Sequence, residues 1–213
     1  ADAEGIQIID VRDERAAIYM AHAHSELTGK LGVALVTAGP GVTNAMTGIA
    51  NAHVARASIL VLSGLPPRPQ ENRGALQDIA HTDLLKSITR YARTVRQSSL
   101  VLQELDEAVS RAMGAGGEPG PVYLDFPTDV LREEVPKPIQ MLEHFRPKIV
   151  RPLLPHADDV SAAIKILWGA KKPLVISGRG ARGAQKELCE FLDKLGAAYL
   201  DTGESKGLVP DSH

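Results

Sequence analysis

Val33-Ala-Leu-Val-Thr-Ala-Gly-Pro-Gly-Val-Thr-Asn44 is the stretch that decides the fold. Residues 33–36 are apolar and predict the end of a buried strand. Gly39-Pro40-Gly41 predicts a sharp turn, and the residues from 42 to about 55 predict a helix. Such a turn lies at the carboxyl end of a strand, where open α/β sheets hold ligands and helix N-termini offer unpaired N–H donors. The same pattern fits a strand–helix connection that binds nothing, and this stretch alone does not separate the two.

The segments on either side alternate between strand and helix patterns. Strands are predicted at residues 6–11, 58–63, 89–95 and 121–126, and helices at residues 12–27 and 100–113. Strands separated by helices predict βαβ units, so we expect an α/β fold with a parallel sheet. A loop rich in proline and arginine runs from Leu65 to about Gln77, and loops of this length are usually functional or mobile.

The composition changes after Pro127, where prolines recur as far as Pro155 and regular periodicity is lost. We therefore expect a first domain at residues 1–128, a linker at 129–156 and a second α/β unit at 157–213. In that unit, helices are predicted at residues 158–169 and 184–195, and strands at 174–177 and 197–201.

The bulk composition is that of an ordinary globular protein. The chain has 213 residues and a formal net charge of −2, so no electrostatic footprint for nucleic acid stands out. No apolar run approaches the ~18 residues that a membrane span needs, and the single cysteine, Cys189, excludes an internal disulfide. We expect a cytoplasmic protein without nucleic-acid or membrane partners. The chain begins without Met and stops in a predicted turn, so we expect it to be part of a longer polypeptide.

Two patterns are candidate sites on the residues alone. Gly178-Arg-Gly-Ala-Arg-Gly183 is a G-x-G-x-x-G sequence between a predicted strand and a predicted helix, with Asp201 at the end of the next strand. In a dinucleotide site, glycines such as Gly178 and Gly180 admit a pyrophosphate; the alternative is a turn whose glycines serve packing. Glu14 lies in the first turn of a predicted helix, where an acid can simply complement the helix dipole. No histidines or acids have ligand spacing, so no metal site is predicted in this chain.

Four stretches occur in a familiar order along the chain. They are Arg12-Asp-Glu-Arg-Ala-Ala17, Thr37-Ala-Gly-Pro-Gly-Val-Thr-Asn44, Gly74-Ala-Leu-Gln-Asp78 and Gly120-Pro-Val-Tyr-Leu-Asp-Phe-Pro127. Together they resemble thiamine diphosphate-dependent enzymes of the acetolactate synthase type. The resemblance implies a parallel-sheet pyrimidine-binding domain without its first strand and helix, followed by part of a Rossmann-like central domain. It also implies that Mg²⁺ and the diphosphate are bound by a C-terminal domain absent from this sequence.

The resemblance assigns roles to single residues. Glu14 would hydrogen-bond the N1′ atom of the cofactor's aminopyrimidine and exchange a proton with it. Gly39, Pro40 and Asn44 match the turn that lies against this ring. Gln77 matches a glutamine that reaches toward the reacting centre, and an ordinary loop glutamine is the alternative.

The chain also departs from the family pattern. Glu118 stands where flavin-binding synthases have arginine, so FAD is possible but not favoured. Leu76 replaces the usual phenylalanine beside Gln77. We expect thiamine diphosphate-dependent decarboxylation or carboligation of a 2-oxo acid by a homodimer or homotetramer, with residues 1–213 inactive alone. The alternatives are an oxalyl-CoA or 2-hydroxyacyl-CoA lyase of the same superfamily, and a non-catalytic nucleotide-binding module that uses the Gly178–Gly183 loop.

Overall fold

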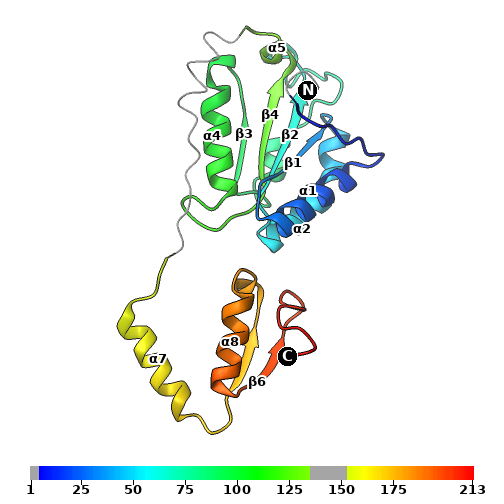
Figure 1. Ribbon diagram of the computed structural model, residues 1–213. Helices are drawn as coiled ribbons and strands as arrows, with labels where there is room; N and C mark the ends of the chain where they lie inside the picture. The colour runs from blue at the N-terminus through cyan, green and yellow to red at the C-terminus, as the bar shows by residue number, and fades with distance from the viewer. Residues whose placement is uncertain (1–4, 135–152) are drawn as a thin grey trace. The chain divides into compact units, whose positions relative to one another are not determined.

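The computed structural model describes residues 5–134 and 153–213, and its contacts divide the chain into a first unit, residues 1–151, and a second unit, residues 152–213. The elements of the first unit are α1 (Glu14–Thr28), β1 (Gly32–Val36), α2 (Pro40–Ala55), β2 (Ile59–Leu65), α3 (His81–Leu85), β3 (Tyr91–Thr94), α4 (Val101–Ala112), β4 (Val122–Pro127) and α5 (Thr128–Leu131). Figure 1 shows the strands between α4 on one face and α1 and α2 on the other.

The sheet of the first unit is parallel throughout, in the order β1-β2-β4-β3. One apolar cluster lies between the sheet and the α1–α2 pair, and a second lies between the sheet and α4. The central strands β2 and β4 are therefore covered on both faces, as their nearly continuous apolar sequences require. On the edge strand β1 the side chains alternate, and Val33 and Leu35 are exposed.

Two glycines bring α1 close to its neighbours. A Cβ on Gly48 of α2 would lie 2.8 Å from both Cβ and Cγ2 of Ile18, which is fully buried on α1. A Cβ on Gly32 of β1 would lie 2.1 Å from the carbonyl oxygen of Ala21. The start of α1 is set by Asp13, whose side chain accepts a hydrogen bond from the Arg15 N–H at 2.9 Å. The position of Glu14 therefore follows from a cap and two close contacts.

The second unit contains α7 (Ala157–Gly169), β5 (Leu174–Ser177), α8 (Gln185–Leu195) and β6 (Ala198–Asp201). The strands β5 and β6 pair in parallel, with Leu174 opposite Ala198. The Ser177 and Tyr199 hydroxyl groups are 2.7 Å apart, and Ser205 donates to the Ser177 carbonyl at 2.7 Å. These bonds fix the loops that follow the two strands.

The predicted α/β fold with a parallel sheet is confirmed, but the predicted strand at residues 6–11 is wrong. These residues form no strand, and Ile6, Ile8 and Ile9 are all at least 60% exposed. A strand needs a hydrogen-bonded neighbour, and within the described residues this segment pairs with neither edge of the sheet. The one-turn helix α5 begins at Thr128 and extends into the predicted linker, most of which lies outside the described residues. The domain boundaries stay predictions.

Candidate functional site

The Gly39-Pro40-Gly41 turn joins β1 to α2 at the carboxyl end of the sheet. Gly39 has φ +63° and ψ −114°, a conformation that side-chain-bearing residues rarely adopt. Its carbonyl group accepts from the Thr43 N–H at 3.1 Å, and Pro40 occupies the first helical position, where no N–H is needed. Gly39 and Gly41 are buried and Pro40 is exposed. The helix thus begins two residues earlier than the sequence predicted.

Glu14 and Asn44 meet where the N-termini of α1 and α2 converge. The Asn44 Nδ2 group donates to Glu14 Oε2 at 2.7 Å. Gly41 lies beside them, because a Cβ there would be 3.5 Å from Glu14 Oε1 and 2.6 Å from Thr37 Cγ2. Glu14 Oε1 itself has no hydrogen-bond partner within residues 5–134 and 153–213. Asn44 thus holds one of the two carboxylate oxygens of Glu14 in place.

Gln77 lies on the other side of the same turn. A Cβ on Gly39 would be 2.9 Å from the Gln77 Cα and 2.8 Å from its Cβ, so the loop after β2 packs directly on the turn. Gln77 adopts φ +67°, which is uncommon for a residue with a side chain. Leu76 beside it is 88% exposed. The structure therefore brings together all five residues that the sequence singled out in the first unit: Glu14, Gly39, Pro40, Asn44 and Gln77.

A buried group of polar side chains under the turn was missed by sequence reasoning. The Gly39 N–H donates to His81 Nε2 at 2.8 Å, and His81 Nδ1 lies 3.3 Å from Asp125 Oδ2. The Tyr123 hydroxyl donates to the same carboxylate oxygen at 3.1 Å and lies 2.7 Å from Ser63 Oγ. All four side chains are at most 2% exposed. No local sequence signal marks His81, because its partner Asp125 is 44 residues away in the sequence.

Ion pairs attach the loop of Gln77 to neighbouring elements. Arg68 bonds Asp129 at 2.7 Å and Glu133 at 2.5 Å, and its guanidinium lowers the pKa of Asp129. Arg96 bonds Glu71 at 2.6 Å and lowers the pKa of that carboxyl group. The loop between β2 and α3 is thus tied at two points ahead of Gln77.

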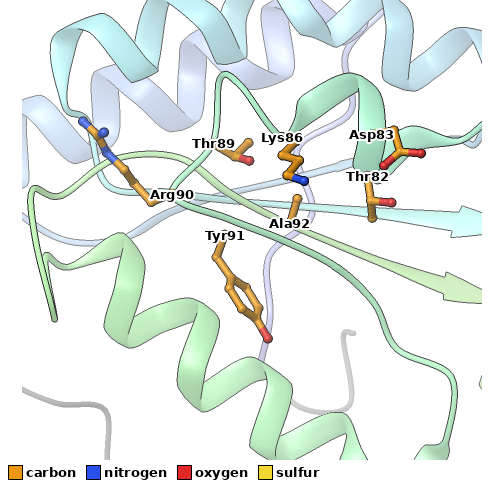
Figure 2. A pocket seen from close by; sticks show the side chains of 7 residues that line it. All are labelled: Thr82, Asp83, Lys86, Thr89, Arg90, Tyr91 and Ala92. Atoms are coloured by element: carbon orange, nitrogen blue, oxygen red, sulfur yellow. The ribbon is translucent and has the colours of Figure 1, made fainter.

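Glu118, which stands where flavin-binding synthases have arginine, lies ahead of β4, at the end of the sheet opposite the turn. Glu118 bonds Arg56 at 2.9 Å and Arg90 at 3.0 Å, so its charge is matched by two arginines. A surface cavity of about 360 Å³ lies nearby, and Figure 2 shows Tyr91 pointing away from its other lining side chains toward α4. The lining residues are Thr82, Asp83, Lys86, Thr89, Arg90, Tyr91 and Ala92. None of them belongs to the turn, so this cavity is separate from the candidate site.

In the second unit, the glycine loop follows β5 as predicted. Residues 179–181 form a 3-10 turn, and Arg182 bonds Glu204 at 2.9 Å. A Cβ on Gly180 would meet nothing within 4 Å, and one on Gly178 would meet only Thr202 Oγ1 at 3.8 Å. Packing within the described residues therefore does not require glycine at either position, and a ligand role for Gly178 and Gly180 stays a prediction.

Comparison with known proteins identifies the family. Residues 1–85 match the thiamine pyrophosphate enzyme N-terminal TPP binding domain, and residues 160–213 match the central domain of the same enzymes. The chain belongs to the thiamine pyrophosphate enzyme family. The first match contains Glu14, the Gly39 turn and Gln77, and the second contains the glycine loop. The expected pyrimidine-binding domain followed by part of a Rossmann-like domain fits these matches.

Two of the proteins similar to this chain carry different names. The chain is 32% identical to a 2-hydroxyacyl-CoA lyase of Arabidopsis thaliana, over 100% of this chain and 38% of the relative. It is 33% identical to the acetolactate synthase isozyme 3 large subunit of Escherichia coli, over 98% of this chain and 37% of the relative. The chain therefore spans less than two fifths of the length of the curated relatives it matches.

The described residues show neither a membrane-spanning helix nor a cluster of metal ligands. No helix in residues 5–134 or 153–213 is long and apolar enough to cross a membrane. Within the same residues, no three His, Cys, Asp or Glu side chains gather as metal ligands. Binding of Mg²⁺ by another part of the protein stays a prediction of the family resemblance.

Proposed function

We propose that the protein catalyses thiamine diphosphate-dependent decarboxylation or carboligation of a 2-oxo acid, in the manner of an acetolactate synthase. The observation that carries the proposal is the Glu14 carboxylate, anchored through one oxygen by Asn44 at 2.7 Å beside the Gly39-Pro40-Gly41 turn. Thiamine diphosphate, when bound, supplies a carbon that adds to the substrate carbonyl group and accepts the electron pair released when a bond to it breaks.

The residues around the turn fit the aminopyrimidine ring of this cofactor. Gly41 presents no side chain beside Glu14 Oε1, and Pro40 is the exposed residue of the turn. A flat ring can lie against the turn at Pro40 while a ring nitrogen hydrogen-bonds Glu14 Oε1, which has no partner within the described residues. A side chain at position 41 would collide with Thr37 and lie against Glu14 Oε1.

Each residue of the site has a separate task in the proposal. Glu14 holds a proton at Oε1 and passes it to, or takes it from, a ring nitrogen. Asn44 keeps Oε2 occupied, so that only Oε1 faces the ligand. Gln77, in contact with Gly39, offers an amide donor and acceptor toward the substrate. Homodimer or homotetramer assembly is part of the proposal and rests on the resemblance alone.

Glu14→Gln in the whole protein tests the proposal. The amide keeps the shape of the side chain and cannot transfer a proton as the carboxyl group does. We expect CO₂ release from pyruvate with thiamine diphosphate and Mg²⁺ to fall by about 10²-fold or more. Glu26→Gln is the matched control, because it removes a carboxyl group near the other end of the same helix, where Glu26 pairs with His22 at 3.9 Å. Unchanged turnover of the Glu14 variant would refute the proposal.

A 2-hydroxyacyl-CoA lyase is the second candidate function. The similarity to the Arabidopsis thaliana lyase, at 32% identity, favours it as much as the similarity to the acetolactate synthase subunit favours the first. Supplying pyruvate and a 2-hydroxyacyl-CoA thioester to parallel samples separates the two. Consumption of the thioester without CO₂ release from pyruvate would select the lyase. In either case, Glu14→Gln should lose the activity that the wild type shows.

A further inference from the structure

We propose that His81 is a positioning residue. Its neutral imidazole, oriented by Asp125, accepts a hydrogen bond from the Gly39 N–H and so holds the turn against which the cofactor ring would lie. The part that concerns the ring rests on the proposed function. The hydrogen-bond arrangement itself is a property of this chain and can be tested without any cofactor.

The contact with Gly39 determines the protonation of His81. A backbone N–H can only donate, so His81 Nε2, at 2.8 Å, must accept and carry no proton. The proton of the neutral ring then resides on Nδ1, which faces Asp125 Oδ2 at 3.3 Å. An imidazolium would place two donors against each other at Nε2. The turn and the carboxylate thus select one tautomer from opposite sides of the ring.

The Asp125 carboxylate, which orients His81, is itself held by a second hydrogen-bond donor on the same strand. Tyr123 donates to Asp125 Oδ2 at 3.1 Å and contacts Ser63 at 2.7 Å. Burial raises the pKa of the Tyr123 hydroxyl, which therefore stays protonated as a donor. Asp125 Oδ1 is buried and has no hydrogen-bond partner within the described residues. Both donors converge on Oδ2, and the chain of contacts runs from the turn through β4 to β2.

The Gly39 turn depends on His81 as a hydrogen-bond acceptor, because few other backbone arrangements are open to these residues. Gly39 is buried, its φ of +63° is uncommon, and Pro40 after it has no N–H to contribute. A buried N–H without a partner is costly, so loss of the acceptor favours another backbone conformation. His81 also begins α3, directly after the loop that carries Gln77. One ring therefore connects the two segments that pack against each other at Gly39.

Nuclear magnetic resonance of the ¹⁵N-labelled 213-residue chain tests the arrangement directly. We expect the His81 ring nitrogens to show the Nδ1–H tautomer and a through-bond coupling between the Gly39 nitrogen and His81 Nε2. An Nε2–H tautomer, an imidazolium at neutral pH, or absence of the coupling would overturn the inference. Because thiamine diphosphate is not added, this outcome is independent of the Glu14 experiment.

Two substitutions at position 81 separate positioning from simple packing. His81→Phe keeps a ring and removes the acceptor, whereas His81→Gln retains a neutral acceptor at similar reach. We expect the Gly39 amide to exchange about tenfold faster with solvent in His81→Phe, with the rate partly restored in His81→Gln. Unchanged exchange in a folded His81→Phe chain would overturn the inference. If His81→Phe does not fold, the wild-type coupling and the His81→Gln exchange rate decide.

The consequence for the site has its own measurement in the whole protein. A misplaced turn should lower turnover by up to about 10²-fold in His81→Phe, and less in His81→Gln. Tyr123→Phe, which leaves the His81–Asp125 contact in place, should retain more activity than His81→Phe. Equal losses in the two position-81 variants, with the coupling present in the wild type, would show that the acceptor holds the turn but does not serve catalysis, and would overturn that part of the inference.

Discussion

Gly48→Ala tests whether the close packing of α1 on α2 sets the position of Glu14. The added Cβ would lie 2.8 Å from both Cβ and Cγ2 of Ile18, whereas carbon atoms pack best at about 3.5–4.0 Å. The helices must therefore separate by up to about 1 Å. Ile18 is fully buried, so it cannot turn into solvent.

The expected cost is a difference of two opposing effects. Overpacking a core costs about 1–3 kcal/mol, and replacing glycine by alanine in a helix gains about 1 kcal/mol. We expect a net destabilisation of about 1 kcal/mol, which lowers the unfolding temperature of the first unit by about 2–4 °C. Separation of the helices also stretches the 2.7 Å bond between Glu14 and Asn44, so the Asn44 side-chain amide signals should shift.

Thermal unfolding by circular dichroism and ¹⁵N spectra of the chain supply the two readouts. Gly169→Ala is the matched control, because a Cβ there meets nothing within 4 Å, and it should alter neither readout for the first unit. Ile18→Leu removes the Cγ2 branch, so Gly48→Ala should be less damaging in that background by about 0.5 kcal/mol or more. A Gly48→Ala chain more stable than the wild type, or purely additive effects with Ile18→Leu, would refute the reasoning.

Two further predictions concern the turn and its loop. Gly39→Ala should destabilise the first unit by about 1–3 kcal/mol and displace Gln77, because it combines an unfavourable φ with a contact of 2.9 Å to the Gln77 backbone; an unfolding midpoint equal to that of the wild type in urea would contradict this. Arg96 lowers the pKa of Glu71 in the folded state, so the stability from this pair is present above the unfolded value of 4.5 and is lost as the pH falls through the folded pKa. Glu71→Gln should therefore flatten the fall of stability below pH ~4.5, by at most about 1 kcal/mol for so exposed a pair, and a slope identical to that of the wild type in acid titrations of urea unfolding would count against the pair.

The strands and long helices could be predicted because their patterns are local. The apolar run before Gly39 and the turn itself gave β1 and the start of α2 within two residues. The family resemblance assigned Glu14 and Asn44 to the same cofactor ring but did not predict their direct contact. The structure shows that contact, and its physical cause lies in the capping of α1 and the missing side chain at Gly41.

The misses have physical reasons. The five residues of α3 are too few to show helical periodicity. His81 and Asp125 lie on elements that only the completed sheet brings together. The sequence around either residue therefore does not predict their contact. The segment at residues 6–11 has the composition of a strand, but composition cannot supply the neighbour that a strand needs.

The exposed edge of β1 has a consequence for handling this chain. Leu35 is 72% exposed and Val33 is 56% exposed, beside backbone groups that no other strand pairs within the described residues. An apolar strand edge of this kind is a template for the addition of a further strand, from the same chain or another copy. Self-association of residues 1–213 should therefore rise with concentration, and a charged residue in place of Leu35 is the substitution that would oppose it.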